Sequence, residues 1–224
     1  TGQRNTRSVD FPVLAVLDPG ARGQLLAELR RRKFGRNEVL VHAGDPADSM
    51  HLIAKGRVLV TLMNANGERV DVAILGSGKC FGELSMLSHP EQRTATITAI
   101  EPTETLVLRR DQLDRLRRRY PAIDRLIAEL LAERVLRLGN ELLDVLFVPA
   151  HRRVIRRIID LCAEFGDGTT PTEIPLNQKT LSGLAGTTRP TVNQVLQELM
   201  ARNQIKLARG RIIVWDLDGL RRRA

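Results

Sequence analysis

The chain has few cysteines and no cysteine cluster. Its two cysteines among 224 residues, Cys80 and Cys162, lie far apart and without Cys-x-x-Cys spacing. A disulfide framework is therefore not indicated, and the reducing cytoplasm is the expected compartment. The histidines are also few, and none has the spacing of a metal site: His42, His51, His89 and His151. The sequence predicts no bound metal.

Long apolar runs and catalytic motifs are missing too. Charged residues interrupt every apolar run well short of the roughly 18 residues that a membrane-spanning helix needs. No charged-then-apolar leader precedes Asp10, so we expect neither a signal peptide nor a membrane partner. The chain contains no nucleophile beside a plausible base, no phosphate-binding P-loop and no metal motif. The sequence therefore does not predict an enzyme.

Positive charge is abundant and unevenly placed. The net charge is +9, and residues 149–224 hold 13 Lys plus Arg against 7 Asp plus Glu, a net +6. This concentration favours nucleic acid as the partner of the C-terminal part. An arginine-rich surface can also reflect genome composition, so charge alone does not identify the partner.

Residues 38–108 have the pattern of an antiparallel β domain. Short β-rich runs begin at Val39, Met50, Arg57, Arg69, Thr94 and Thr105, with glycine-containing turns between them. Asn66-Gly67 lies between two alternating runs and predicts a hairpin with a type I′ turn. Regularly spaced strands of this kind predict a barrel or jelly roll. A short amphipathic helix over residues 24–32 is expected to precede the strands.

From Asp111 onward the periodicity is helical, and residues 121–147 carry a narrow apolar seam. Its members alternate in spacing between three and four: Ala128, Leu131, Val135, Leu138, Leu142 and Val145. Such a seam is typical of helix pairing between two copies of a chain. A helix packed on its own domain is the alternative, since Leu126, Ile127 and Leu130 are apolar outside the seam. Pro149 is expected to end the helix and mark a hinge.

The C-terminal part has helix-turn-helix spacing. A helix over 152–164 and a loop over 166–175 precede residues 178–199, where Gly186 breaks an apolar pattern and Thr188 can cap a second helix. Two runs, 204–207 and 211–215, predict a β wing. The terminal run 221–223 is expected to be a solvated tail.

Residues early in the second of these helices are expected to enter the DNA major groove. Arg189 can bond bidentately to guanine O6 and N7. A phosphate contact or a surface charge is the structural alternative for Arg189. The predicted DNA-binding residues are Gln178, Thr188, Arg189, Thr191, Asn193 and Gln194.

Residues 81–96, FGELSMLSHPEQRTAT, combine an acceptor carboxylate with a guanidinium. Arg93 offers a planar fork of donors for phosphate oxygens, whereas Glu83 accepts hydrogen bonds and suits a ribose hydroxyl. The stretch therefore predicts a cradle for a small sugar phosphate. For any single residue, an ordinary turn or a surface charge is the simpler interpretation. Cys80 beside it is expected to be a buried small residue rather than a redox switch.

With Phe81-Gly82-Glu83-Leu84-Ser85 and Arg93-Thr94-Ala95, the chain resembles the Crp/Fnr family of bacterial transcription regulators. The resemblance implies an α+β fold: a cyclic-nucleotide-binding β-roll or jelly-roll domain (1–119), a long dimerisation helix (120–147) and a winged helix-turn-helix domain (148–224). It favours the homodimer and implies cyclic AMP as an allosteric ligand, with double-stranded DNA and RNA polymerase as partners. By resemblance, Glu83 holds the ribose 2′-hydroxyl, and Arg93 and Thr94 hold the cyclic phosphate. The implied ligand-binding residues are Gly82, Glu83, Leu84, Ser85, Arg93, Thr94, Ala95, Arg134, Leu138 and Gly139.

Two positions depart from the family pattern. Leu138 and Gly139 stand where cyclic-AMP-binding relatives have a Thr or Ser pair for the adenine, which leaves Asn140, Arg134 and Thr94 as the nearest polar candidates. Pro190 replaces a Glu that many relatives carry, so no operator sequence is predicted. Cyclic GMP, another ligand or no ligand therefore stay open, as does a nucleotide-binding module that signals through a protein partner. Two lone cysteines argue against an iron-sulfur sensor, while His89 leaves haem less cleanly excluded.

Overall fold

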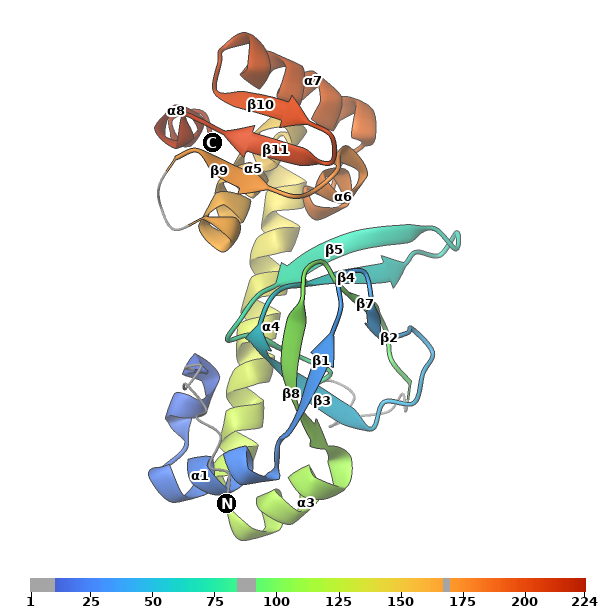
Figure 1. Ribbon diagram of the computed structural model, residues 1–224, viewed down its shortest axis with the longest axis vertical. Coiled ribbons are helices and arrows are strands. Elements are labelled where there is room, and N and C mark those ends of the chain that lie inside the picture. The colour runs from blue at the N-terminus through green and yellow to red at the C-terminus, as the bar shows by residue number, and fades with distance from the viewer. Residues whose placement is uncertain (1–10, 84–91, 167–169) are drawn as a thin grey trace. The chain divides into compact units, whose positions relative to one another are not determined.

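The computed structural model describes residues 11–83, 92–166 and 170–224 (Figure 1). Contacts divide the chain into two compact units: residues up to Gly67 with Ala73–Arg137, and Glu68–Val72 with Leu138–Ala224. The division falls inside one continuous helix, α4 (Ala122–Phe147). Among the described residues, no helix combines the length and the apolar character needed to cross a membrane.

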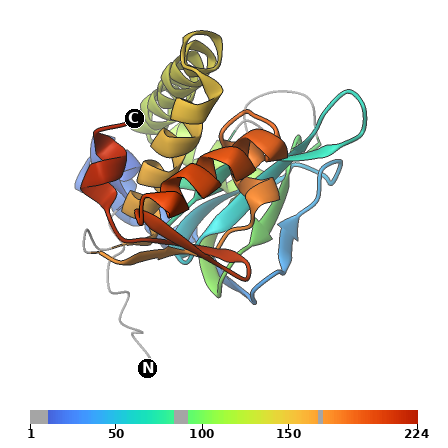
Figure 2. The same ribbon diagram turned by 90° about the horizontal axis from the view of Figure 1, so that it is seen from above.

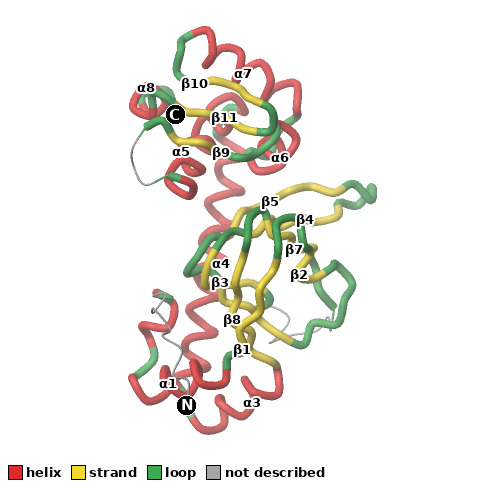
Figure 3. Tube along the Cα trace, in the orientation of Figure 1, coloured by secondary structure: helices red, strands yellow, loops and turns green. Residues whose placement is uncertain are grey.

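The first unit is built on two antiparallel four-stranded sheets. Their strand orders are β1-β8-β3-β6 and β2-β7-β4-β5. The strands are β1 (Arg30–Phe34), β2 (Val39–Val41), β3 (Ser49–Lys55), β4 (Val58–Met63), β5 (Arg69–Leu75), β6 (Cys80–Phe81), β7 (Thr96–Ala99) and β8 (Thr103–Arg109). Each predicted β-rich run overlaps one of these strands, which confirms the predicted β domain. The strands appear in yellow in Figure 3.

Helices close one side of this unit over an apolar core. They are the 3-10 helix η1 (Pro12–Val16), α1 (Pro19–Glu28), α3 (Arg110–Arg119) and the first turns of α4. Leu52 and Leu108 from the sheet pack with Leu113 of α3 and Ile123 of α4, all almost fully buried. Burial of such side chains contributes on the order of 1.5–3 kcal/mol each, so this core fixes the sheet against the helices.

The predicted helix over 24–32 was wrong at both ends. The helix α1 begins earlier, at Pro19, where the Asp18 side chain caps it by accepting from the N–H of Ala21. It ends at Glu28, and Arg30–Phe34 form the edge strand β1. Cross-strand pairing overrides the helical spacing, because β8 places Glu104 opposite Lys33 and beside Arg31, with which it forms ion pairs.

The hairpin between β4 and β5 was predicted correctly, but its turn type was not. Gly67 has a φ of +78°, whereas Asn66 is not among the positive-φ residues, so the turn is not type I′. The Asn64 side chain accepts from the N–H of Asn66, and the Asn64 carbonyl accepts from the N–H of Gly67. This side-chain bond favours an Asx-type turn over the primed turn.

The helix α4 runs from Ala122 to Phe147 and changes its surroundings along its length. Leu126, Ile127 and Leu130 pack into the core of the first unit. Further along, the apolar side chains are exposed: Val135, Leu136, Leu138, Leu142, Leu143, Val145, Leu146 and Phe147. The alternative that the helix packs on its own domain therefore holds for the first turns of α4. In the C-terminal turns of this single chain, the apolar side chains are exposed to solvent.

The second unit combines helices with a three-stranded sheet of order β10-β11-β9. Its elements are α5 (Ala150–Phe165), β9 (Thr172–Ile174), α6 (Gln178–Leu184), α7 (Arg189–Ala201), β10 (Ile205–Ala208), β11 (Arg211–Val214) and α8 (Leu217–Arg221). Val154 and Ile158 of α5 are fully buried, as are Val192 and Leu196 of α7. Seen from above, the red strand pair lies beside the orange-red helices (Figure 2). The predicted winged helix-turn-helix is confirmed.

Two expectations for this unit need correction. The predicted loop 166–175 contains the strand β9, which pairs with β11 through Ile174 opposite Ile212. The run 221–223 is not a plain solvated tail, because Arg221 ends α8 and the Arg223 Nη1 atom is buried. Burial of Leu220 on the domain explains why α8 forms.

Candidate nucleotide and DNA sites

Gly82 and Arg93 meet at the end of β6. Gly82 has a φ of +85°, in the left-handed region that favours glycine. A Cβ atom placed on it would lie 2.6 Å from Arg93 Nη1 and 2.8 Å from the carbonyl oxygen of Ser49. Both the conformation and the crowding require glycine here, and they bring the guanidinium against the residue that precedes Glu83.

Arg93 is a buried cation with unused donors. Only 6% of the residue is exposed, and its Nη2 atom donates to Ser49 Oγ at 2.9 Å. Its Nε and Nη1 atoms are buried and have no partner among the described residues. Burial lowers the pKa of Arg93 from its ordinary value, whereas the charges of Asp48 and Asp45 oppose that shift. A buried guanidinium with free N–H groups is strongly disposed to bind an anion.

The main chain at Arg93 is anchored independently of its side chain. Its N–H donates to the Asp45 carbonyl and its carbonyl accepts from the N–H of Gly44, both at 2.8 Å. An isolated bridge between Pro46 and Gln92 extends this pairing. The turn before β3 therefore holds the position from which the Arg93 side chain enters the β domain.

The other residues of the predicted cassette occupy varied positions. Glu83 is half-buried after β6, Thr94 is exposed and Ala95 is half-buried. Leu84, Ser85 and His89 lie outside the described residues. Cys80 is a half-buried free thiol whose pKa burial raises to about 12, with Glu83 adding to the shift. Such a thiol stays protonated at neutral pH, which agrees with an inert side chain.

The predicted ligand residues of α4 fall in different units. Arg134 belongs to the first unit and is half-buried, with an Nε atom that has no partner among the described residues. Leu138 and Gly139 belong to the second unit and are exposed.

The helix-turn-helix has the local features that its sequence predicts. Gly186 in the turn has a φ of +57°, and the Thr188 hydroxyl caps α7 by accepting from the N–H of Thr191. Pro190 lies in the first turn of α7, where it needs no intrahelical donor. In α6 the Asn177 side chain provides the cap, so Gln178 is the first helical residue.

The predicted DNA-contacting side chains differ in their exposure to solvent and in their hydrogen bonds. Arg189, Asn193 and Gln194 are exposed, and Arg189 and Asn193 lie one turn apart on one face of α7. The hydroxyls of Thr188 and Thr191 are 3.0 Å apart, so they also serve the cap. The Gln194 amide donates weakly to Glu198 at 3.4 Å. Arg189 and Asn193 therefore lie together on an exposed face near the start of α7.

Arg153 makes contacts that the sequence did not reveal. Its Nη1 atom donates to the Val148 carbonyl at 2.7 Å and to the Val145 carbonyl at 3.3 Å. Its Nε and Nη2 atoms donate to the carbonyls of Ala185 and Gly186 at 3.1 and 2.8 Å. One side chain thus joins the end of α4 to the turn of the helix-turn-helix.

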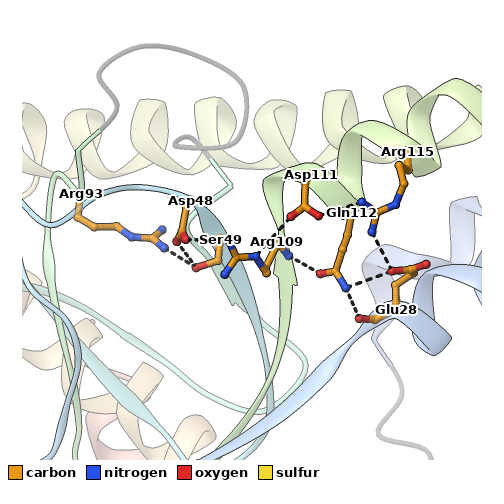
Figure 4. Close-up of polar contacts among 8 residues, drawn as sticks. All are labelled: Glu28, Asp48, Ser49, Arg93, Arg109, Asp111, Gln112 and Arg115. Carbon is orange, nitrogen blue, oxygen red and sulfur yellow. Dashed lines mark hydrogen bonds and ion pairs between the residues drawn. The ribbon is translucent and has the colours of Figure 1, made fainter.

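Ser49 and Asp48 were also missed, because nothing in their sequence context links them to Arg93. Figure 4 shows the Ser49 hydroxyl in contact with both Arg93 and Asp48, and a chain of polar contacts that continues from Asp48 through Arg109 to α3. Gln112 of that helix accepts from the N–H of Arg109 and donates to Glu28.

Metal-ligating groups of three or more His, Cys, Asp or Glu side chains do not occur in the described parts of the chain. His51 is buried. Its ring stacks on Phe81 with 4.7 Å between the ring centroids, and its Nδ1 atom lies 3.1 Å from Thr105 Oγ1. Burial lowers its pKa to about 3, with the charge of Arg93 contributing.

Two family profiles match the chain. Residues 31–120 match the cyclic nucleotide-binding domain, and residues 152–223 match the Crp-like helix-turn-helix domain. The cyclic AMP receptor protein of Thermus thermophilus is 32% identical over 91% of this chain and 92% of its own length. The chain belongs to the Crp/Fnr family of transcription regulators.

Other members of the Crp/Fnr family agree with this assignment. The CRP-like cAMP-activated global transcriptional regulator of Mycobacterium tuberculosis is 29% identical over 93% of this chain and 94% of its own length. The structure of the Thermus thermophilus catabolite activator protein has a TM-score of 0.55 at 30% identity, covering 94% of this chain and 96% of that protein. The curated relatives are transcription regulators rather than enzymes, so this Crp/Fnr chain is a regulator with a cyclic nucleotide-binding domain.

Proposed function

We propose that this protein is a homodimeric regulator that binds specific DNA under the control of a cyclic nucleotide, cyclic AMP in the first place. The observation that carries the proposal is the buried Arg93 guanidinium beside Gly82 and Glu83, with Nε and Nη1 lacking partners among the described residues. Buried N–H groups without acceptors are costly, and the oxygen atoms of a cyclic phosphate would accept from them. Glu83 would accept from the ribose 2′-hydroxyl, and the backbone of Leu84, Ser85, Thr94 and Ala95 would complete the cradle.

The base half of the site supports only weak discrimination. Leu138 and Gly139 offer no side-chain hydrogen bond to an adenine amino group, and Arg134, Asn140 and Thr94 are the polar candidates for a base. A site that packs against a base without bonding to it discriminates weakly. We therefore expect cyclic AMP and cyclic GMP to bind with little preference.

The apolar face of α4 supports the homodimer. Four residues of the predicted seam, Val135, Leu138, Leu142 and Val145, lie on one side of α4, and each is at least 48% exposed. A second copy would cover these side chains. Two α7 helices could then contact major grooves about 34 Å apart on a pseudo-palindrome.

We retain the division into a cyclic-nucleotide-binding domain (1–119), a dimerisation helix (120–147) and a DNA-binding domain (148–224). Ligand would act through its different affinity for two states of the dimer, with the hinge at 147–149. RNA polymerase is the expected partner on DNA, and bacterial relatives make the cytoplasm the expected compartment.

A different cyclic nucleotide is the second candidate ligand. The c-di-GMP responsive global regulator of Xanthomonas campestris shares the fold, with a TM-score of 0.74 at 20% identity. That protein responds to c-di-GMP, a larger ligand that also carries phosphates, which a buried guanidinium could hold.

Calorimetric titration tests the ligand. Cyclic AMP, cyclic GMP and c-di-GMP are titrated into the wild type and into the Glu83→Ala and Arg93→Ala variants, with and without operator DNA selected from random sequences. We expect cyclic AMP and cyclic GMP to bind the wild type and to bind both variants poorly. Equal affinity of the wild type and both variants for the cyclic nucleotides would refute the site. If c-di-GMP alone binds, it replaces cyclic AMP as the proposed ligand.

Selection on random operators tests the DNA site. Arg189→Ala should lose about 1–3 kcal/mol at one base position and relax the preference there, because a bidentate bond to guanine is removed. A phosphate contact would instead weaken all sequences alike. Sequence-independent binding by the wild type would favour the alternative of a nucleotide-binding module that signals through a protein partner.

A further inference from the structure

Ser49 is the one described side chain that bonds to the Arg93 guanidinium. The Arg93 Nη2 atom donates to Ser49 Oγ at 2.9 Å in a buried setting, and Ser49 Oγ lies 3.1 Å from Asp48 Oδ1 (Figure 4). A guanidinium has no acceptor, so the hydroxyl must accept from Arg93. Its own proton is then free to go to Asp48. The direction of both hydrogen bonds is therefore fixed.

Strand pairing brings Ser49 to the cassette. Ser49 begins β3, and two residues later His51 pairs with Phe81 of β6, which places Gly82 alongside. The Ser49 carbonyl oxygen is only 2.8 Å from where a Gly82 Cβ would lie. Ser49, Gly82 and Arg93 consequently meet at one point of the β domain, although 33 residues separate the first two.

The Ser49 hydroxyl contacts the side chain of Arg93 and can therefore fix its position. The backbone is already held by Gly44 and Asp45. A long flexible side chain loses rotamer freedom when it binds a ligand, and a group that holds it beforehand reduces that loss. The bond to Nη2 leaves Nε and Nη1 unoccupied by described residues.

We propose that Ser49 is a positioning residue for anion recognition. It holds the Arg93 guanidinium beside Gly82 so that Nε and Nη1 are available to the phosphate of a cyclic nucleotide, and Asp48 orients the Ser49 hydroxyl. The proposal rests on the proposed function, because it assigns the phosphate to Arg93.

Calorimetric titration of cyclic AMP into a small set of variants tests the proposal. Ser49→Ala should weaken binding by roughly tenfold, the loss expected for a hydrogen bond to a charged group. Ser49→Thr keeps the hydroxyl and should restore affinity to within about threefold of the wild type. Asp48→Ala removes the acceptor that orients the hydroxyl, together with the ion pair between Asp48 and Arg109, and its expected loss is smaller, about threefold. It also provides the test if Ser49→Ala does not fold.

The outcomes separate this inference from the proposed function. If Arg93→Ala abolishes binding while Ser49→Ala binds as tightly as the wild type, or more tightly, Ser49 has no positioning role and only this inference fails. Equal weakening by Ser49→Thr and Ser49→Ala would overturn it as well, because the hydroxyl would then be irrelevant. If Arg93→Ala binds like the wild type, the proposed function itself fails. Unfolding midpoints of the unliganded variants serve as the control for folding.

Discussion

Two arginines, one in each unit, differ in how completely their donors are used. Arg153 in the second unit donates to four backbone carbonyls, from Val145, Val148, Ala185 and Gly186. Arg93 in the first unit is more deeply buried, yet it donates to Ser49 alone among the described residues. A guanidinium whose donors are all bonded within the protein stabilises the fold, whereas one with unbonded buried donors can bind an external anion. Under the proposed function, the two arginines therefore have different roles: Arg153 stabilises the fold and Arg93 binds the ligand.

The largest expected effect is on ligand affinity at Arg93. Arg93→Ala should weaken cyclic AMP binding by at least about 100-fold, because charge-assisted bonds to the phosphate are lost. The same change should leave the unliganded protein about as stable as the wild type, since it removes a buried cation with unused donors. Calorimetry and urea unfolding measure the two quantities. A large loss of stability in the unliganded variant would mean that Arg93 is structural.

Arg153→Ala should show the opposite behaviour. We expect the free energy of unfolding of the second unit to fall by about 2 kcal/mol, because four carbonyls lose a charged donor. The affinity for cyclic AMP, measured in the absence of DNA, should not change. Arg153→Lys is the matched control: it keeps the charge but not the planar fork, and should recover only part of the stability. Full recovery with lysine would show that charge alone matters there.

Each arginine also has a glycine beside it, and the two glycines sharpen the comparison. Gly82→Ala would put a Cβ within 2.6 Å of Arg93 Nη1 and 2.8 Å of a carbonyl oxygen. We expect a loss of about 2 kcal/mol in stability, with weakened ligand binding. At Gly186 the nearest atom outside its neighbours is Val145 Cγ2, at 3.4 Å, so Gly186→Ala should cost only the strain of a positive φ, about 1 kcal/mol. Urea unfolding of both variants checks the order.

A further effect depends on pH and concerns the buried His51, whose pKa Arg93 helps to lower. His51 is neutral in the fold, with a pKa lowered to about 3 chiefly by burial and then by Arg93. The unfolded chain binds this proton near pH 6.5, so the stabilisation from a neutral His51 is present above pH 6.5 and is lost as pH falls toward 3. The loss is about 1.4 kcal/mol per pH unit. His51→Gln should flatten that slope in urea unfolding between pH 6.5 and 4.5, and an unchanged slope would contradict the assignment.

The sequence predicted elements that depend on local chemistry and missed those that depend on distant pairing. Gly186, Thr188 and Pro190 define the start of α7 by themselves, so the helix-turn-helix was predicted closely. The first residues of β1 were mistaken for helix, because the strand depends on pairing with β8, about 70 residues away, where Glu104 forms ion pairs with Arg31 and Lys33. Gly82 and Arg93 were predicted from a local motif. Ser49 was not, because only the pairing of β3 with β6 brings it to Arg93.

The four bonds of Arg153 also limit how the second unit can move. Val145 and Val148 close α4, while Ala185 and Gly186 form the turn before α7, and a single rigid plane of nitrogen atoms serves both pairs. A planar group cannot rotate toward one pair of acceptors without leaving the other. The turn before α7 and the end of α4 therefore cannot move independently of each other. A twist in the last turn of α4 must therefore either move the turn before α7 with it or break some of these four hydrogen bonds.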